Sequence, residues 1–462
     1  MIAATQQLES YLESFSEFEK LAAGHSLPWL RQLRQEAFAR FCQTGLPTTR
    51  DEDWRFTNVA TIAQTPFRLD RQIRIRREDL PPGQLALSAA RLVFVNGRFA
   101  EDLSSFDDLP RTVEAGSLRA QIEKNSQPLE AHFGRYLNFQ RDAFSALNTA
   151  FAEDGAYVHI RRGAALEKPI HLLFISVANG GSVMSHPRNL ILAEEGSQAA
   201  IVEDYISLPS EGAGEPALCN AVTELVAADQ AVISHYMIER EALNAFNIST
   251  LRIQQGRGAN VASHSVLLGG ALVRNNVHPV LAGEGAECLV NGLFIGGGRQ
   301  HMDNYMMVEH ASPHCASRQF YNGILDGHAQ GVFHGRIIVH NAAQKTDAKQ
   351  TNRNLLLSDD AQIHTKPQLE IYADDVKCTH GATIGQIEED ALFYLRSRGI
   401  DEASARKLLL SAFASECLER MKQEGVRKYI EQVLSHHLAG VGTLPAQGNR
   451  SEERGRSWEE IA

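Results

Sequence analysis

The sequence predicts a mainly β chain in which a long central β region lies between two helical regions. Near both ends, apolar residues recur every three or four positions, which is typical of amphipathic helices. Between about residues 155 and 388, short runs rich in Val, Ile and Leu alternate with Gly, Asn and Asp turns. Similar turn signals return every 27 to 42 residues, near Gly196, Asp229, Gly258, Gly285, Gly327 and Asp360.

A period of about 20 to 50 residues in a β region favours a solenoid or a propeller. The intervals here are uneven, however, so the pattern alone leaves a β-sandwich or a β-barrel open.

Residues 1–154 are predicted to form an N-terminal helical region. The first 45 residues form two helices, and Pro28 is tolerated in the first turn of the second. Gly45 and Pro47 end that helix. The segment 91–99 predicts a short β-hairpin with an Asn-Gly turn. The β core is expected to follow over residues 155–387.

Residues 388–440 are predicted to form a C-terminal helical domain. Gly399 ends its first helix and Asp401 caps the second. The last 22 residues, 441–462, have no apolar stripe and are predicted to be a flexible tail. The apolar stripe expected on the second helix consists of Ala405, Leu409, Phe413 and Cys417, widened by Leu408, Ala412 and Leu418.

Composition excludes several classes of protein. The chain has 45 Lys and Arg against 56 Asp and Glu, for a net charge of −11, which argues against nucleic-acid binding and against adsorption to anionic lipid. It contains no apolar stretch of membrane-spanning length and no signal-peptide pattern, so we expect a cytoplasmic protein. The signatures GxxxxGK[ST], HExxH and GxSxG are absent, as is a clear GxGxxG.

Histidine and cysteine are the candidate metal ligands. Ten of the 18 histidines lie between His264 and His380, and imidazole suits several transition metals. For most of them we favour packing on a sheet face or bonding to backbone. The six cysteines are scattered without a CxxC pair, so they are expected to be thiols, most of them buried.

The segment Cys378-Thr379-His380 is the exception. If it is a strand, residues two apart point to the same face, so a thiolate and an imidazole lie side by side. Such donors hold zinc or the iron of an iron–sulfur cluster. Two donors cannot complete a four-coordinate site, so the others would come from elsewhere in the fold, from a second chain or from solvent.

Two groups of residues resemble a known family. The C-terminal group comprises LLLSDDA (355–361), KPQLEI (366–371), DDVKCTHGATIG (374–385) and YLRSRGI (394–400). The N-terminal group is EDWRFT (52–57). Together they resemble the SufB/SufD family of iron–sulfur cluster assembly scaffold proteins, over about residues 5 to 440. Gly381 stands where SufB-type members tend to carry Glu, which favours the SufD type.

The resemblance implies a right-handed parallel β-helix core flanked by N-terminal and C-terminal α-helical regions. It also implies a non-enzymatic scaffold subunit that pairs with a SufB-like protein through the β-helix. The C-terminal helices would dock a SufC-like ATPase, and a cysteine desulfurase system would supply sulfur indirectly. A nascent Fe–S cluster would be held transiently with SufB, and reduced flavin would associate with the whole complex.

The resemblance also implies functional residues. His380 and Cys378 match the family's interfacial cluster site and are the expected metal ligands. We also expect that the isolated chain can form a homodimer through the surface meant for SufB. The candidates for the SufC-docking region are Tyr394, Arg396, Arg398, Gly399, Leu409 and Phe413.

Two other functions remain open at this point. One is a metal-dependent enzyme that uses the histidine-rich stretch on a β-helix or barrel. The other is a purely structural subunit, which only completes a dimer and positions the ATPases.

Overall fold

The chain folds into a β-solenoid of about seven turns, flanked by N-terminal and C-terminal helices. The computed structural model describes residues 2–69, 73–80, 88–178, 180–209 and 214–438. About 40% of the chain is strand and 25% helix. The predicted fold class is confirmed. None of the described helices is long and apolar enough to cross a membrane.

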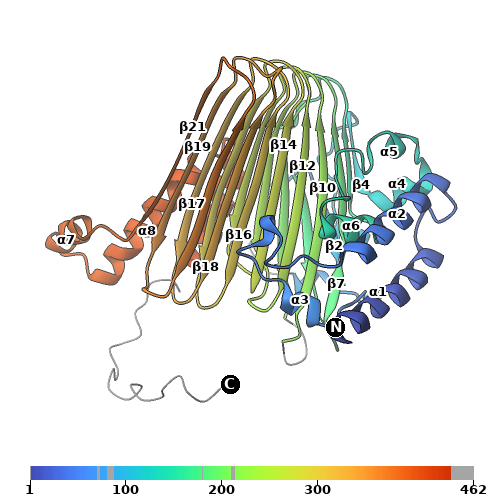
Figure 1. Ribbon diagram of the computed structural model, residues 1–462, viewed down its shortest axis with the longest axis horizontal. Helices are drawn as coiled ribbons and strands as arrows, with labels where there is room; N and C mark the ends of the chain where they lie inside the picture. The colour runs from blue at the N-terminus through green and yellow to red at the C-terminus, as the bar shows by residue number, and fades with distance from the viewer. Residues whose placement is uncertain (1, 70–72, 81–87, 179, 210–213, 439–462) are drawn as a thin grey trace.

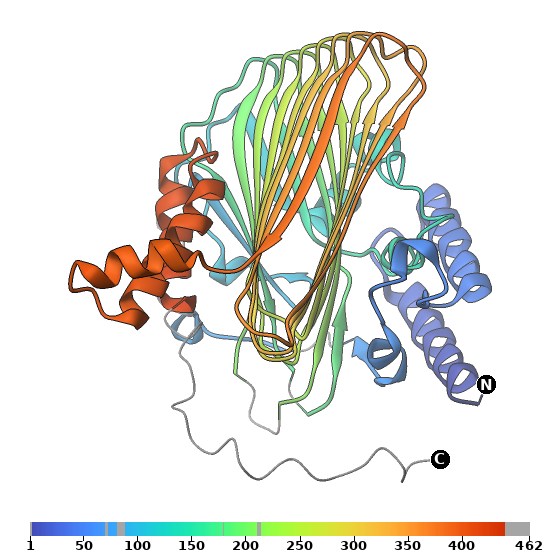
Figure 2. The same ribbon diagram turned by 60° about the vertical axis from the view of Figure 1, so that its left-hand side comes forward.

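Two sheets face each other across the interior of the solenoid (Figure 2), and successive strands alternate between them. Among the described residues, the first sheet, sheet A, runs in the order β20-β18-β16-β14-β12-β10-β8-β5-β4. β1 and β7 join it beside β10. Its strands are β1 (Arg68–Leu69), β4 (Val113–Ser117), β5 (Ala156–Ile160), β7 (Val183–Ser185), β8 (Arg188–Ala193), β10 (Ala217–Ala227), β12 (Phe246–Gln255), β14 (Leu272–Leu281), β16 (His301–His310), β18 (Gln330–Val339) and β20 (Gln362–Ile371).

The second sheet, sheet B, runs in the order β21-β19-β17-β15-β13-β11-β9-β6-β2-β3 within the described part of the chain. From β6 to β21 every pairing is parallel, and β2 and β3 form a hairpin through Asn96-Gly97. Its strands are β2 (Ala90–Val95), β3 (Arg98–Phe99), β6 (Ile170–Ser176), β9 (Gln198–Ser207), β11 (Val232–Arg240), β13 (Asn260–Leu267), β15 (Glu287–Gly296), β17 (Ala316–Leu325), β19 (Asp347–Leu356) and β21 (Lys377–Gly385).

One turn is repeated in every coil and sets the period of the solenoid. Each of six successive strands of sheet B is preceded, two residues earlier, by a residue with φ between 59° and 69°. The backbone N–H of each of these residues donates to a carbonyl of the next coil, at 2.6–3.1 Å. Four of the six predicted turn positions belong to this ladder or stand next to it. The six residues are Gly196, Gln230, Gly258, Gly285, His314 and Lys345.

The N-terminal helices cover the outer face of sheet A (Figure 2). Phe15, Phe38 and Phe151 pack together there, with the rings of Phe15 and Phe38 stacked at 3.9 Å. The apolar cluster continues onto Phe246 and Leu272 of the sheet. The helices of this region are α1 (Ile2–Leu21), α2 (Pro28–Thr44), α3 (Ala60–Gln64), α4 (Leu118–Lys124), α5 (Gln127–His132) and α6 (Ala143–Ala150), with short 3-10 turns η1 (Glu52–Trp54), η2 (Arg77–Asp79) and η3 (Glu101–Leu103).

The EDWRFT segment crosses the outer face of sheet A. The Trp54 side chain is buried, with the Arg274 guanidinium 3.9 Å from the centre of its ring. Arg274 Nη1 pairs with Asp303 Oδ2 at 2.5 Å, and Thr57 Oγ1 donates to the same oxygen at 2.5 Å. Because Arg274 and Asp303 are both buried, this segment is anchored to two successive strands, β14 and β16.

The C-terminal helices are α7 (Glu389–Ser397), α8 (Glu402–Leu418) and α9 (Glu424–His437). α8 and α9 cover the outer face of sheet B, whereas α7 has no buried residue and projects from the body (Figure 1). On α8 the buried residues are Ala405, Leu410, Ala414, Cys417 and Leu418.

The apolar stripe expected on α8 is therefore partly wrong. Leu408 and Ala412 are exposed, and Leu409 and Phe413 are only half-buried. Residues 408 to 410 are all leucine, so a helical apolar stripe can be drawn on more than one face of α8. The face that packs on sheet B is the one that carries Leu410. The division into regions 1–154, 155–387 and 388–440 stays a prediction, and the predicted tail, 441–462, lies outside the described residues.

Replacing Arg274 by Met should destabilise the fold, because it leaves the Asp303 carboxylate buried without its cation. Breaking a buried ion pair in this way costs about 3 to 5 kcal/mol. We expect a clear fall in the midpoint of urea unfolding. Arg257→Met, which removes an exposed pair with Asp229, should change that midpoint little. Equal effects of the two substitutions would show that the Arg274 pair does not anchor the segment.

Candidate functional site

The C-terminal end of the solenoid is open. β21 pairs only with β19 and β20 only with β18, so each sheet ends in a strand edge that no described strand covers. Apolar side chains of this last coil are exposed, with Tyr372 60% and Ile384 52% accessible. Exposed strand edges with apolar side chains are sites at which another chain can add.

The register of β21 on β19 places Cys378 and His380 over interior positions of the preceding coil. Cys378 lies opposite Ala348, which is buried in the interior core, and His380 lies opposite the buried Gln350. Cys378 itself is half-buried against that core, whereas His380 is exposed. Side chains at matching register positions of successive coils form columns inside the solenoid. The Cys378 thiol and the His380 imidazole each extend one such column, and both lie on the same face of the end strand.

Burial raises the pKa of the Cys378 thiol above its ordinary value. A metal ion that binds there must displace the thiol proton, so metal binding is favoured as the pH rises. Among the described residues, no group of three or more His, Cys, Asp or Glu side chains is arranged to hold a metal ion. Cys378 and His380 therefore form an incomplete donor set.

The other histidines of the β region have local roles. The ring of His264 stacks on Tyr236 at 4.9 Å, and His310 Nε2 lies 2.8 Å from Ser317 Oγ. His278 Nε2 lies 2.6 Å from Glu309 Oε1. His264 packs on a neighbouring ring as expected, whereas His278 and His310 pair with side chains rather than with backbone.

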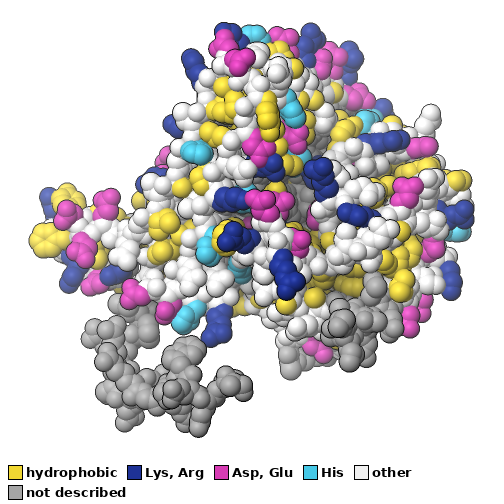
Figure 3. Space-filling model, viewed as in Figure 1, with side chains coloured by type: hydrophobic (Ala, Val, Ile, Leu, Met, Phe, Trp, Pro, Cys, Tyr) yellow, Lys and Arg dark blue, Asp and Glu magenta, His cyan; other side chains and the backbone are white. Residues whose placement is uncertain are grey.

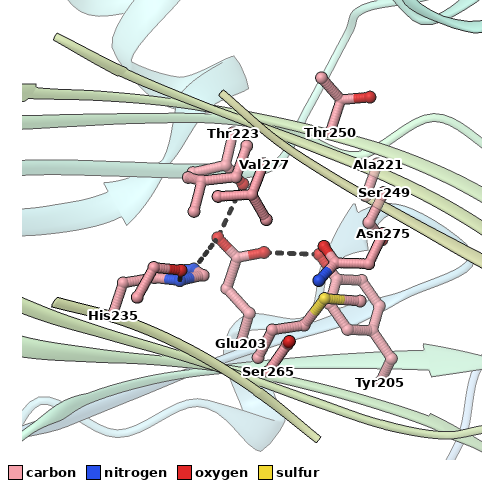
Figure 4. Close-up of a pocket in the computed structure, with 13 residues that line it drawn as sticks. Glu203, Tyr205, Ala221, Thr223, His235, Ser249, Thr250, Ser265, Asn275 and Val277 are labelled. Carbon is pink, nitrogen blue, oxygen red and sulfur yellow. Dashed lines mark hydrogen bonds and ion pairs between the residues drawn. The ribbon is translucent and has the colours of Figure 1, made fainter. Parts of the chain in front are cut away.

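A buried polar cluster inside the solenoid was not foreseen (Figure 4). Glu203 accepts hydrogen bonds from Tyr205 at 2.6 Å and from Thr223 at 2.7 Å, and His235 Nε2 lies 3.3 Å from it. Burial opposes ionisation of Glu203, but its three partners outweigh burial and hold its pKa below the usual value. The adjoining cavity of about 10 Å³ is at most large enough for one water molecule, so the cluster is no substrate site.

The candidates for ATPase docking fall into two groups. Tyr394, Arg396, Arg398 and Gly399 lie on or just after α7, where the Arg398 guanidinium is 4.9 Å from the centre of the Tyr394 ring. Phe413 instead faces the body, with the Arg353 guanidinium 5.3 Å from its ring centre. Leu409 is half-buried on the same helix as Phe413, α8.

The sequence analysis did not single out Phe393, and it placed Leu408 in the apolar stripe, but both side chains are exposed. Phe393 of α7 is 73% accessible and Leu408 of α8 is 50% accessible. A helical pattern does not distinguish an apolar residue that packs on the body from one left at the surface. Whether a given apolar residue of these helices is buried depends on whether its side of the helix contacts a sheet.

Comparison with known proteins gives matches along nearly the whole chain. The family model for the SUF system FeS cluster assembly SufBD core domain matches residues 174–413, and the model for the SufBD protein N-terminal region matches residues 5–172. An iron–sulfur cluster assembly SufBD family protein of Synechocystis is 34% identical over 446 residues, covering 93% of this chain and 95% of the relative.

Two relatives carry the name iron–sulfur cluster assembly protein SufD. That of Escherichia coli is 31% identical over 412 residues, covering 88% of this chain and 92% of the relative. That of Bacillus subtilis is 24% identical over 443 residues, covering 93% of this chain and 98% of the relative.

Because Cys378 is half-buried whereas Cys288 and Cys417 are buried, we expect Cys378 to be alkylated before these two cysteines in the native chain. Iodoacetamide should label Cys378, and its rate should rise about tenfold per pH unit below the raised pKa, because only the thiolate reacts. The buried Cys288 and Cys417 should label only after unfolding. Peptide mass spectrometry of native and denatured samples measures the labelling of Cys378 and that of the two buried cysteines. Labelling of Cys288 as fast as Cys378 in the native chain would contradict this arrangement.

Proposed function

Since the chain belongs to the SufBD family of iron–sulfur cluster assembly proteins and is SufD-like, we propose that it is a non-enzymatic scaffold subunit of a SufBCD-type complex. The observation that carries this proposal is the incomplete donor pair, Cys378 and His380, on the open end of the solenoid. A site that lacks ligands and lies on an uncovered edge is suited to completion by a second protein.

The proposed partner at this end is a SufB-like protein. Its own terminal coil would add to β20 and β21, satisfy their free backbone groups and cover Tyr372 and Ile384. Pairing edge to edge would extend both sheets of the solenoid across the interface, with antiparallel strands, because the two terminal coils meet head to head. In isolation, a second copy of the chain could occupy the same edge and form a homodimer.

The proposed cargo of this interface is a nascent iron–sulfur cluster, which is a substrate of the complex and not a resident cofactor. His380 would supply an imidazole nitrogen and Cys378 a thiolate, while the remaining ligands, including a thiolate, would come from the SufB-like partner. The donor types fit this role, since thiolate and imidazole both ligate iron in such clusters. Sulfur would arrive through a cysteine desulfurase system.

The C-terminal helices are the proposed docking region for a SufC-like ATPase. α7 has no buried residue, yet it exposes Phe393 and Tyr394 beside the cations Arg396 and Arg398. An aromatic pair with adjacent arginines is a composition typical of interface hot spots. ATP would be bound by that partner, since this sequence contains no P-loop motif.

Two further expectations belong to the same proposal. Reduced flavin would be bound by the whole complex, and the complex would work in the cytoplasm.

Phe413 would contribute to ATPase docking indirectly. Its side chain faces Arg353 of β19 and packs α8 on sheet B, so it would support the docking region from within the fold.

Replacing His380 by Ala should lower the amount of cluster that the complex can hold without preventing its assembly. The exposed imidazole makes no hydrogen bond to any described residue, so its loss should leave the fold unchanged. The measurement is anaerobic reconstitution with the matching SufB-like and SufC-like proteins, read as iron and sulfide per complex. His25→Ala, an exposed histidine of the N-terminal region, is the matched control.

The outcome separates scaffold from purely structural roles. Less iron and sulfide in an intact complex supports ligation by His380. Equal cluster content in variant and wild type would contradict ligation and favour the structural role, and a complex that fails to assemble would assign His380 to the interface alone. Cys378→Ser applies the same test to the thiolate.

Replacing Phe393 by Asp should abolish co-purification with the SufC-like ATPase. The side chain is 73% accessible and contributes nothing to the core, so the variant should keep the wild-type unfolding midpoint. Leu243→Asp is the matched control, because Leu243 is 70% accessible on a turn between β11 and β12 and does not belong to α7. Undiminished ATPase binding by Phe393→Asp would remove α7 from the docking surface.

A further inference from the structure

A groove lies between the N-terminal region and the outer face of sheet A, and it extends to Gln368 and Glu370 of the terminal strand β20. Its deeper part is a cavity of about 280 Å³, and a second cavity of about 560 Å³ adjoins it through Trp54, Arg141 and Arg336. Figure 3 shows a hollow in the middle of this face, bordered by both acidic and basic side chains. The proposed scaffold function makes no use of this groove.

The carboxylates of the deeper cavity already have partners. Asp142 caps α6 by accepting from the backbone N–H groups of Phe144 and Ser145. Glu309 pairs with His278 at 2.6 Å and lies 3.3 Å from His340. The Asp53 side chain is hydrogen-bonded to Tyr305, a contact that helps to raise the pKa of Tyr305, chiefly through burial, to about 12.

The arginines of the same cavity, in contrast, keep unused donors. Arg252 makes no hydrogen bond and no ion pair within 4 Å with any described residue, although its Nε is shielded from solvent. The exposed Arg141 likewise has no side-chain partner among those residues. Arg336 uses one Nη nitrogen for Glu370, and its buried Nε has no partner.

This imbalance defines the chemistry of a ligand. Guanidinium groups can only donate, and a buried donor without an acceptor is unfavourable. The carboxylates around the cavity are engaged, so the ligand must bring several acceptor oxygens and negative charge. Burial lowers the pKa of Arg252, with Asp142 and Glu309 partly offsetting that effect, but an arginine stays charged in proteins.

We propose that this groove is a binding site for a phosphate-type oxyanion, held by Arg252, Arg336 and Arg141. Arginine is the residue best suited to phosphate, because its planar fork donates two parallel hydrogen bonds to a pair of phosphate oxygens. Three arginines around 280 Å³ suit a diphosphate group better than a single phosphate. Arg274 covers one face of the Trp54 ring and one face of the Tyr305 ring. Phe144 also packs against Trp54 and His334 against Tyr305, which leaves little ring surface for stacking on a base or other planar group.

The test is isothermal titration of the full chain with inorganic pyrophosphate. We expect saturable binding at one site per chain and a loss of affinity of about tenfold or more in Arg252→Gln, since a charge-assisted interaction is removed. Arg141→Gln, at an exposed position, should also weaken binding and keeps the test independent of any folding defect. Arg257→Gln, on an exposed turn outside the groove, should bind as the wild type does.

Three outcomes would overturn the proposal. The first is the absence of saturable pyrophosphate binding by the wild type. The second is equal affinity in Arg252→Gln, Arg141→Gln and Arg257→Gln. The third is equally tight binding of citrate, which would assign the groove to carboxylates. None of these results depends on cluster assembly, so the anion-site proposal and the scaffold proposal are tested independently.

Discussion

The register in which successive coils stack is the constraint on which the rest of this structure depends. Each strand from β6 onward pairs in parallel with the strand one coil earlier, so an inward side chain always lies over an inward side chain. The left-handed turn residue before each of six successive strands of sheet B, β9 to β19, supports this register from coil to coil. Both sheets of the solenoid are open rather than closed into a barrel, so the last coil keeps two free edges, those of β20 and β21. The proposed partner surface is thus a direct consequence of the fold.

Stacking also explains why His380 lies where it does. In the column that ends at His380, the preceding coils carry Gln350 and Gln319, and the amide of Gln350 donates to Gln319 at 2.7 Å inside the solenoid. His235 belongs to the same column several coils earlier. The column is therefore partly polar along its length, and His380 is its exposed last member. Cys378 continues the neighbouring, more apolar column over Ala348, which accounts for its half-buried thiol.

The two segments that carry the family resemblance meet in space although some 310 residues separate them. Glu52 pairs with Lys366 of β20 at 2.8 Å, and the Phe56 ring stacks on His364 at 4.2 Å. With the Arg274–Asp303 pair beneath it, the N-terminal segment holds the outer face of the last coils. The coil that exposes Cys378 and His380 is thereby supported from sheet A, which would keep the donor pair in place while a partner binds.

The sequence by itself determined the helix–β–helix order, the helix cap at Asp401 and the common face of Cys378 and His380, because each follows from local periodicity or from side-chain chemistry. It did not determine the even repeat, since His314 and Lys345 occupy left-handed turns where glycine is the recognisable signal. Nor did it select the buried face of α8 among three consecutive leucines. Those choices, and the gathering of Arg141, Arg252 and Arg336 around one cavity, were decided by the tertiary structure, because they depend on which distant segments pack together.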